Sequence, residues 1–382
     1  MVRSILSCCD VSFLTQSARE VCYLDQVLDH SKQESPMRLG RLIALCLMTT
    51  LGAATAADAC SRLLYETGTR SFIVARSMDW SDTSAKTSLW VFPQGMQRDG
   101  GLGENPFKWT SKYGSIIATL YDAATVDGIN EKGLVGNVLY LAEADYGDAA
   151  ETGKPSLSIG AWLQFFLDNY ANVEDAVEAM QEAPFTIVAP VLPNGRPASG
   201  HLSISDSSGD SAIFEYLEGK LVIHHGSEYR VMTNSPTYDQ QLALNTYWEL
   251  IGGDKFLPGT VSAADRFARL SYNLRASPKY KDPKLAMASA FSQIRAMSVP
   301  LGMNDPEHPN IASTLWRTVA DDGAKRYFFE SAVFPAVFWV DLAKVDMGPD
   351  ASPMMLAVDP DKPLAGEVSN HFEAAQPFAW LK

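Results

Sequence analysis

The residue of this sequence with the clearest capacity for chemistry is Cys60. It follows Ala57-Asp58-Ala59, which fits the small-x-small pattern of a signal peptidase site, so cleavage there makes Cys60 the first residue of the mature chain. An N-terminal cysteine carries a thiol nucleophile and, on the same residue, an α-amino group that titrates at about pH 8 and can take the thiol proton. The sequence therefore predicts covalent catalysis by Cys60 without a histidine beside the nucleophile.

The cysteine count supports a role for this thiol. The chain contains five cysteines, Cys8, Cys9, Cys22, Cys46 and Cys60. Cleavage after Ala59 leaves Cys60 alone, so we expect no disulfide within the mature chain. A buried and inert cysteine is the alternative, but the first residue of a chain rarely lies deep in a core.

A thiol nucleophile of this kind needs a cation beside the thiolate, a carboxylate that holds the amine, and donors for the oxyanion. Residues 62–65 and 71–76 are apolar, β-rich runs around a turn, which predicts a hairpin that starts at the nucleophile. Its second strand returns antiparallel beside Cys60, which brings Arg76 and Asp79 near the amino terminus. The alternative for an Arg and an Asp at a strand end is an ordinary solvated surface position.

The segment before Cys60 has the organisation of a secretory signal peptide. Met37-Arg38-Leu39-Gly40-Arg41 is a short basic opening, and residues 42–54 are an apolar run without charge. This run is too short to span a bilayer comfortably, which makes a retained anchor the weaker interpretation. We therefore expect residues 37–59 to be removed and the mature protein to be periplasmic or secreted, with no stable membrane anchor.

Two further interpretations concern the N-terminus. Residues 1–36 mix charged residues, Cys and Ser without clear periodicity, and we expect them to be an upstream extension, with translation starting at Met37. A genuine N-terminal extension that hides the signal is the alternative. A cysteine after an apolar leader also occurs in lipoproteins, but Asp58 fits a lipidation site badly, so lipidation is the minor case.

The composition excludes several partners. The 382 residues are 46% hydrophobic and carry a net charge of −14, which is an ordinary globular composition with an acidic surface. Nucleic acid needs a basic surface, so we predict no nucleic-acid partner. The histidines lack metal-ligand spacing and one cysteine cannot form a zinc cluster, so we predict no metal and no cofactor. We interpret the mature histidines as surface or turn residues: His201, His224, His225, His308 and His371.

The predicted elements change from strands to helices and back to strands. The predicted strands are residues 62–65, 71–76, 115–120, 133–141, 202–205, 211–217, 221–225, 229–233, 314–320, 326–330 and 337–341. Ser158, Asn172 and Ser262 are predicted N-caps of three helices, and residues 283–297 form a fourth. This order favours α+β layers in a single domain over residues 60–382, with an irregular tail after Val345.

Several blocks of the chain together resemble a known family. Cys60 is followed at +16 by Arg76 and at +19 by Asp79, in Ala-Arg-Ser-Met-Asp-Trp. Further blocks follow in the family's order: Asp127-Gly128-Ile129-Asn130-Glu131-Lys132-Gly133-Leu134, Val231-Met232-Thr233-Asn234-Ser235-Pro236-Thr237, Leu257-Pro258-Gly259 with Asp265-Arg266-Phe267, and Thr314-Leu315-Trp316-Arg317-Thr318-Val319-Ala320-Asp321. The ordered set covers most of residues 60–341. It resembles the choloylglycine hydrolase family of N-terminal-nucleophile (Ntn) hydrolases, which holds the bile salt hydrolases and the penicillin V acylases.

The resemblance implies a role for each matching residue. Cys60 would be both nucleophile and base, Arg76 would steady the thiolate, and Asp79 would hydrogen-bond the α-amino group. Asn234 would donate its side-chain amide to the oxyanion. Arg266, near the start of its helix, would complete the polar network.

Two aromatic residues complete the candidate site. The family position that contributes to the oxyanion hole falls at Tyr140, where bile salt hydrolases usually have Asn and some penicillin V acylases have Tyr. An ordinary strand aromatic is the alternative for Tyr140. Trp80 is a candidate for the acyl pocket, and a core tryptophan is an equally good interpretation.

The resemblance also implies a fold, a reaction and an assembly. The fold would be a four-layer αββα sandwich, and the reaction would transfer an apolar acyl group from a linear, non-peptide amide to Cys60 and then to water. Penicillin V-type amides are the first choice of substrate, with acyl-homoserine lactones and conjugated bile salts as alternatives, and a non-catalytic secreted binding protein is the alternative of another class. A homo-oligomer, up to a tetramer, is expected. The chain is shorter between Asn234 and Arg266 than typical gut bile salt hydrolases, which favours the Gram-negative branch and leaves the usual tetramer contacts open.

Overall fold

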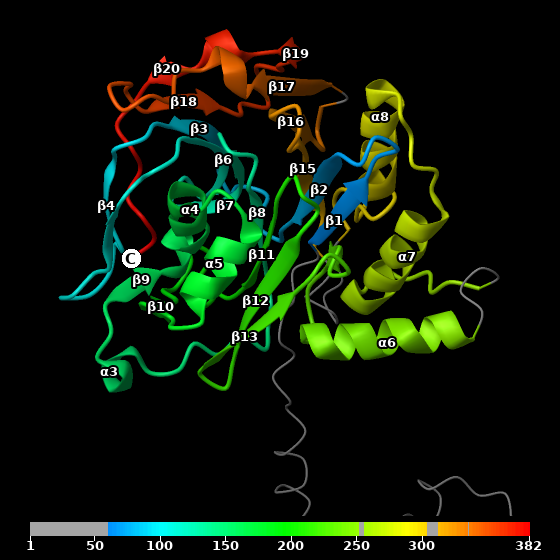
Figure 1. Ribbon diagram of the computed structural model, residues 1–382, viewed down its shortest axis with the longest axis horizontal. Coiled ribbons are helices and arrows are strands. Elements are labelled where there is room, and N and C mark those ends of the chain that lie inside the picture. Colours follow the sequence, from blue (N-terminus) through cyan, green and yellow to red (C-terminus); the bar gives the residue numbers. More distant parts are fainter. Residues whose placement is uncertain (1–59, 252–255, 304–311, 335) are drawn as a thin grey trace, which may run out of the picture. The chain divides into compact units, whose positions relative to one another are not determined.

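The computed structural model describes residues 60–251, 256–303, 312–334 and 336–382. The expected signal peptide and the expected upstream extension lie outside these residues. The described part is an α+β structure with two main β-sheets (Figure 1). None of its helices is long and apolar enough to cross a membrane.

The first main sheet is built around the predicted N-terminal hairpin. Its seven strands lie in the order β14 (Val231–Met232), β1 (Ser61–Glu66), β2 (Phe72–Asp79), β15 (Thr314–Asp321), β16 (Arg326–Ser331), β17 (Val337–Asp341) and β19 (Gly366–Glu367). All neighbours are antiparallel except β17 and β19. The register pairs Ser61 with Ser77 and Thr314 with Asp79, which confirms the predicted hairpin and adds β15 beside it.

The second main sheet has nine strands and is antiparallel throughout. Their order is β13 (Lys220–His225), β12 (Ser211–Leu217), β11 (His201–Ser205), β8 (Val135–Leu139), β7 (Ala124–Asn130), β6 (Ser115–Leu120), β3 (Ser88–Phe92), β18 (Met354–Ala357) and β20 (Glu373–Ala374). Two further sheets have two strands each. One pairs β4 (Gln97–Asp99) with β5 (Lys108–Thr110), and the other pairs β9 (Ser156–Ser158) with β10 (Thr186–Val188).

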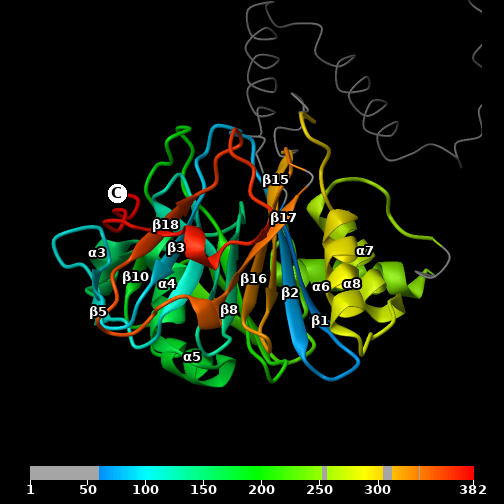
Figure 2. The ribbon, with the colours of Figure 1, turned by 90° about the horizontal axis from the view of Figure 1, so that it is seen from above.

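Helices pack against both main sheets, and three of their predicted caps are confirmed. The helices are α3 (Ala149–Thr152), α4 (Ile159–Asn169), α5 (Val173–Met180), α6 (Tyr238–Leu250), α7 (Ala263–Ala276) and α8 (Pro283–Arg295), with short 3₁₀ turns η2 (Leu342–Lys344) and η3 (Ser369–His371). Ser158, Asn172 and Ser262 each accept a backbone N–H in the first turn of a helix. Helix α4 contacts β7 and β8, whereas α7 and α8 contact β1, and Figure 2 shows these two groups of helices on opposite sides of the strands.

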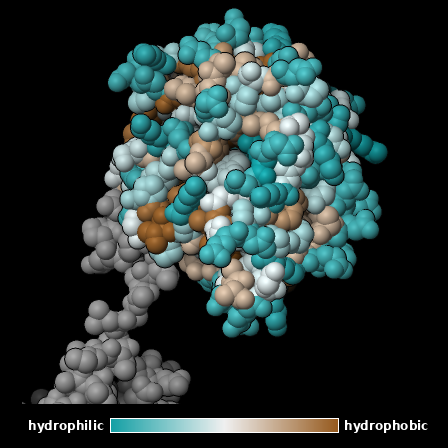
Figure 3. Space-filling model, turned by 90° about the vertical axis from the view of Figure 1, so that its left-hand side faces the viewer, coloured by the Kyte–Doolittle hydropathy of each residue, from teal (hydrophilic) through white to brown (hydrophobic). Residues whose placement is uncertain are grey.

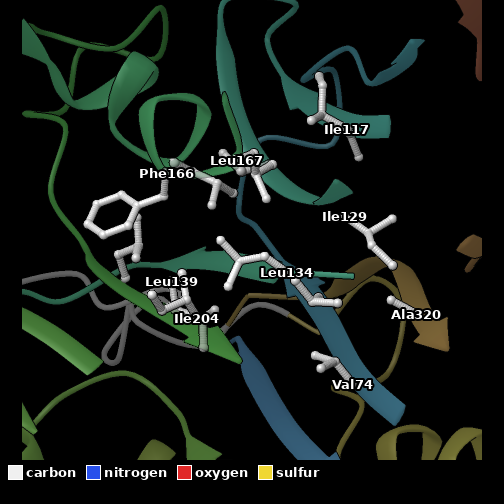
Figure 4. Packing of buried hydrophobic residues seen from close by; sticks show 14 of the residues in the cluster. Val74, Ile117, Ile129, Leu134, Leu139, Phe166, Leu167, Ile204 and Ala320 are labelled. Atoms are coloured by element: carbon white, nitrogen blue, oxygen red, sulfur yellow. The ribbon is translucent and has the colours of Figure 1, made fainter. Parts of the chain in front are cut away.

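The hydrophobic core has one part between the two sheets and one part beneath α4 (Figure 4). Val74 of β2 and Ala320 of β15 lie toward Ile129 of β7 and toward Leu134, which lies between β7 and β8 of the nine-stranded sheet. Phe166 of α4, with its neighbour Leu167, extends this packing on the far side of the nine-stranded sheet. Because both faces of the sheets are covered, strands such as β2, β6 and β11 are buried at every position, although each of them contains polar residues.

The predicted irregular tail after Val345 was wrong in one respect. Met354–Ala357 forms β18 and pairs with β3, and Gly366–Glu367 pairs with β17. The tail is rich in Pro and Asp, which favours loops. Its short apolar run nevertheless completes the edge of a sheet, because β3 leaves its backbone groups to be paired on that side. The face on the left-hand side of Figure 1 is mostly hydrophilic, with apolar side chains gathered in a few small areas (Figure 3).

Candidate active site

Cys60 lies directly before β1 and is 1% exposed. Its Sγ atom is 3.7 Å from the carbonyl oxygen of Asp79 and 3.9 Å from Sδ of Met78, because the β1–β2 register brings the end of β2 alongside it. The burial fits a thiol that faces an internal cavity.

Arg76 is a cation that contacts the Cys60 thiol. Its Nη2 atom lies 3.7 Å from Cys60 Sγ and donates to the carbonyl oxygen of Val138 at 3.1 Å. The guanidinium lies 4.6 Å from the ring centroid of Trp316. A fully buried guanidinium in this position stabilises a thiolate better than a solvated one, since little water screens the charge.

Asp127 holds Arg76 from the other side and was missed as a site residue. Its Oδ2 atom lies 3.7 Å from Arg76 Nη1 and accepts hydrogen bonds from Asn137 and Thr318 at 2.8 and 3.0 Å. Tyr327 donates to Oδ1 at 2.7 Å. Burial raises the pKa of Asp127, while Arg76 and these donors oppose the rise. The sequence contained Asp127 in a recognised block, but its partners come from four other strands, β2, β8, β15 and β16, which spacing does not show.

Asp79 is buried at the end of β2. Its carboxyl accepts a hydrogen bond from the Thr314 hydroxyl and one from Ser77 Oγ at 3.4 Å. Burial raises the pKa of Asp79 from 3.8 to about 7, against the opposing positive charges of Arg266 and Arg76. The group therefore titrates near neutral pH, which suits a residue that interacts with an amine.

Asn234 and Arg266 form a polar link to the nucleophile. The Asn234 amide nitrogen donates to the carbonyl oxygen of Tyr140 at 2.7 Å, and its Oδ1 atom accepts from Arg266 Nη2 at 3.0 Å. Arg266 Nη1 donates to the carbonyl oxygen of Cys60 and to Ser61 Oγ. Burial lowers the pKa of Arg266, and the negative groups Asp79 and Cys60 oppose that change. The predicted site residues just before β1, on β2, on α7 and in the segment after β14 are thus brought together.

An apolar cavity of about 60 Å³ adjoins Cys60. Trp80 and Tyr140 both line it, with their rings edge to face at a centroid separation of 6.4 Å. Trp80 is 5% exposed, so the pocket and core interpretations both apply to it. The remaining lining is mostly aliphatic and comes from β2, β6–β8, α4, the loop between β10 and β11, and the C-terminal segment: Met78, Leu120, Val126, Val138, Ile159, Leu192, Ala198 and Leu381.

A more open groove of about 860 Å³ continues from this cavity, since Tyr140, Ala198 and Ser199 line both. Arg196 lies over the Tyr140 ring at 5.5 Å and over the Trp80 ring at 5.8 Å. A third hollow of about 680 Å³ contains neither Cys60 nor Arg76. The small cavity is therefore the candidate site, because Cys60 and Arg76 line it, and the groove is its continuation. The groove and the third hollow each have more volume, but neither contains Cys60.

The interpretation of the histidines as surface or turn residues is wrong for His201. Its side chain is 0% exposed and lies 2.9 Å from the Glu215 carboxylate. The error arose because the partner is on another strand, β12, which the local sequence does not show. His308 lies outside the described residues. Among those described, no group of three or more His, Cys, Asp or Glu is arranged to hold a metal ion.

Comparison with known proteins gives the family. A model of linear amide C–N hydrolases of the choloylglycine hydrolase family matches residues 60–357. The chain belongs to this family. The match starts at Cys60, which places that residue at the beginning of the family domain, and the predicted resemblance is confirmed.

Relatives within the choloylglycine hydrolase family are similar over most of the chain. Penicillin V acylase of Pectobacterium atrosepticum is 49% identical over 353 residues, covering 86% of this chain and 93% of that protein. Bile salt hydrolase/transferase of Clostridium perfringens is 28% identical over 238 residues, covering 56% and 71%. The penicillin V acylase structure from Agrobacterium tumefaciens matches with a TM-score of 0.78 at 49% identity, covering 84% of this chain and 99% of that one. A mutant conjugated bile acid hydrolase from Clostridium perfringens, at 21% identity and a TM-score of 0.65, shares the fold.

Proposed function

We propose that this chain is a hydrolase of penicillin V-type amides, which acts through an acyl-enzyme on Cys60. The observation that carries the proposal is the position of Cys60 Sγ, 3.7 Å from a buried Arg76 guanidinium and at the wall of an apolar cavity. The 49% identity to two penicillin V acylases supports the same substrate class.

The proposed reaction begins when the α-amino group of Cys60 takes the thiol proton. The thiolate attacks the amide carbonyl carbon, and the oxyanion is stabilised by the Asn234 side-chain amide and by backbone N–H groups near Tyr140. Asn234 has two amide N–H groups, and one of them already donates to the Tyr140 carbonyl. Collapse breaks the C–N bond, the α-ammonium protonates the leaving amine, and a thioester remains. Water then attacks the thioester, with the α-amino group as base, and the acid is released.

This chemistry requires a free amine, which is formed only when the Ala59–Cys60 peptide bond is broken. We propose export and cleavage of residues 37–59, and therefore a periplasmic or secreted enzyme. The sequence Ala57-Asp58-Ala59 supports this site. N-terminal sequencing of the exported, active protein tests it, and an active enzyme that starts at Ala57 or Asp58 would contradict it.

The two connected spaces suit a substrate with an apolar acyl group and a polar amine part. The lining of the inner cavity is almost wholly apolar, as a phenoxyacyl group requires. Arg196, beside the outer groove, is placed to attract the carboxylate of the β-lactam amine. Acyl-homoserine lactones lack this carboxylate, so they use the same cavity without that attraction. Conjugated bile salts carry a far larger acyl group than a phenoxyacyl group, so they require a wider pocket than penicillin V-type amides do.

We expect Leu381 to limit the size of the acyl group that the cavity accepts. It lines the cavity, and its backbone is held by two hydrogen bonds, from its N–H to Ala123 and from Ser158 to its carbonyl oxygen. Leu381→Ala keeps both and enlarges the cavity. We expect kcat/KM for a decanoyl anilide to rise by about tenfold relative to a phenoxyacetyl anilide, the order expected for a few methylene groups in an apolar pocket.

The control for this prediction is Leu364→Ala. Leu364 is a leucine of the same C-terminal region that lines the separate hollow of about 680 Å³. It should leave the ratio of the two substrates unchanged. An unchanged ratio in Leu381→Ala would remove Leu381 from the acyl pocket.

A substrate panel on the purified mature protein tests the proposed function. We expect penicillin V to be hydrolysed with a higher kcat/KM than acyl-homoserine lactones or glycine- and taurine-conjugated bile salts. The competing interpretation, a secreted binding protein with an inactive site, predicts binding without turnover. Against it, Cys60, Arg76, Asp79, Asn234 and Arg266 are all retained and lie in one buried network.

We also propose that the layers form the four-layer αββα sandwich of the Ntn hydrolases and that the protein is a homo-oligomer. The contacts of α4 with one sheet and of α7 and α8 with the other support the layering.

Helix α6 supports the assembly, because Leu244, Tyr247 and Leu250 are 41%, 55% and 81% exposed. A second copy of the chain is the proposed partner for this apolar face. The molar mass by light scattering tests the assembly, and a monomer at micromolar concentration would contradict it.

A further inference from the structure

His201 makes a hydrogen bond through each ring nitrogen, and both partners are acceptors. Nδ1 lies 2.9 Å from Glu215 Oε1, and Nε2 lies 2.7 Å from the carbonyl oxygen of Thr233. A carbonyl oxygen cannot donate, and an ionised carboxylate cannot donate either. A neutral imidazole carries one N–H, so one of its nitrogens would direct a lone pair at an acceptor. With Glu215 ionised, only the doubly protonated imidazolium satisfies both contacts.

The surroundings keep Glu215 in its ionised form. Burial acts to raise the pKa of Glu215, but the hydrogen bond and charge of His201 and the Tyr238 N–H hold it below its ordinary value. The Tyr238 N–H lies 3.1 Å from each carboxylate oxygen, at the start of α6. An ionised Glu215 leaves the imidazolium as its buried counter-charge.

Other ionisable groups face this pair from each adjoining element. His224 of β13 lies 3.9 Å from Glu215 and 3.8 Å from Asp239 of α6. The remaining groups are Tyr238 of α6, Arg62 of β1, whose charge acts on Tyr238, and Tyr146, whose hydroxyl bonds Gly200 next to His201. None of them offers a donor to either nitrogen of His201 among the described contacts.

The carbonyl that His201 holds belongs to the residue before Asn234. The Thr233 hydroxyl donates to Gln241 and to the carbonyl oxygen of Ala263, and the Gln241 amide donates to the carbonyl of Asn234. The backbone on both sides of Asn234 is therefore held by buried groups. A carbonyl fixed at 2.7 Å by a cation restricts rotation of the Thr233–Asn234 peptide, and so sets the direction of the Asn234 side chain.

We propose that His201, kept as an imidazolium by Glu215, is a positioning residue that fixes the Thr233–Asn234 backbone and thereby aims the oxyanion-stabilising amide of Asn234. The inference rests on the proposed function, because it assumes that Asn234 stabilises an oxyanion. His201 and Glu215 touch no substrate; they act through Asn234. The pair also gives the enzyme an upper pH limit, since loss of the imidazolium proton releases the Thr233 carbonyl.

The protonation state is measured on the wild-type chain from Cys60 onward, with no variant that must fold. In ¹⁵N spectra of its imidazoles at about pH 8, where an ordinary histidine is neutral, one ring should keep both nitrogens protonated. That signal should be absent in His201→Asn. Spectra in which every imidazole is neutral would overturn the inference.

Kinetics then test the positioning role. We expect His201→Asn to lower kcat by about tenfold to a hundredfold, less than the roughly 10²–10³-fold cost of deleting an oxyanion donor, with little change in KM. In Glu215→Gln the imidazolium loses its carboxylate, so its proton leaves at lower pH. The alkaline limb of the kcat profile should therefore move to lower pH, while the acidic limb, set by the α-amino group, should stay in place.

The matched control is the His225–Asp210 pair, which is built from the same kinds of group. His225 Nε2 lies 2.8 Å from Asp210 Oδ2, and both side chains are partly exposed, by 35% and 26%. His225→Asn and Asp210→Asn should change neither kcat nor the pH profile. An unmoved alkaline limb in a folded Glu215→Gln would overturn the positioning role.

Asn234→Ala separates the two proposals. If this variant loses turnover and His201→Asn does not, the inference fails while the proposed function stands. If Asn234→Ala keeps full turnover, Asn234 is no oxyanion donor and the inference fails, although the proposed hydrolysis stands. If the processed wild type itself hydrolyses no penicillin V-type amide, the proposed function fails. Loss of turnover in Asn234→Ala, a smaller loss in His201→Asn, and a shifted alkaline limb in Glu215→Gln together support the inference.

Discussion

Cys60→Ser should give a folded protein that binds its amide substrate and hydrolyses little or none of it. Serine keeps the shape of the side chain, but its hydroxyl is a weaker acid than the thiol, so the same α-amino group is a poor base for it. Arg76, 3.7 Å from Sγ, stabilises a thiolate and cannot make up for this mismatch. Cys60→Ala should remove turnover altogether.

The measurement pairs kcat with substrate binding by calorimetry on the mature variants. Processing is the necessary control, because an uncleaved Ala59 would also remove the base and abolish turnover. N-terminal sequencing must therefore find position 60 exposed in each variant. A processed Cys60→Ala with wild-type turnover would show that the nucleophile lies elsewhere.

Asp79→Asn should reduce kcat by about 10²–10⁴-fold, the usual cost of losing a positioned acid–base partner, with a smaller effect on KM. The carboxyl is fully buried at the end of β2, and the backbone carbonyl oxygen of the same residue lies 3.7 Å from Cys60 Sγ. An amide keeps the Thr314 hydrogen bond but cannot stabilise the α-ammonium that forms during the reaction.

The matched control for Asp79→Asn is Asp341→Asn. Asp341 also ends a strand of the seven-stranded sheet, but it is paired with the exposed Arg326 at 3.4 Å, away from Cys60. Its kcat should equal that of wild type. If Asp79→Asn shows the same unchanged kcat, Asp79 is not part of the site.

The raised pKa of Asp79 also predicts a change in stability with pH. In the uncleaved chain, where the Cys60 nitrogen is an amide, burial raises the pKa of Asp79 from 3.8 to about 7. Between these values the unfolded state loses the proton and the folded state keeps it, so the free energy of unfolding should fall as pH rises through this window. Chemical denaturation of uncleaved wild type and Asp79→Asn measures this, and the variant should lack that part of the fall. An identical pH dependence in both would contradict it.

The local sequence predicts those parts of the fold that depend on residues close together in the chain. The hairpin of β1 and β2 follows from two apolar runs around a short turn, and the helix starts follow from Ser158, Asn172 and Ser262. Strand β18 was missed because only its pairing with β3, far away in the chain, makes it a strand. Local patterns carry no information on such distant partners.

The same difference between local and distant partners applies to the residues of the active site. The resemblance brought out Cys60, Arg76 and Asp79 together because they lie on one hairpin, where spacing and geometry coincide. Asp127 has its partners on other strands, and His201 has its partners on β12 and just after β14, so no spacing revealed them. Buried polar groups of this kind become visible only when the strands are assembled.

The most direct test of the central claim is thiol labelling of the mature enzyme. The chain from Cys60 to Lys382 has a single cysteine, so one equivalent of an alkylating agent can modify only Cys60. Intact mass and the rate of penicillin V hydrolysis are measured on the same sample at several degrees of labelling. We predict that the fraction of activity lost equals the fraction of singly alkylated protein. A fully alkylated enzyme that keeps its rate would show that Cys60 is not the nucleophile.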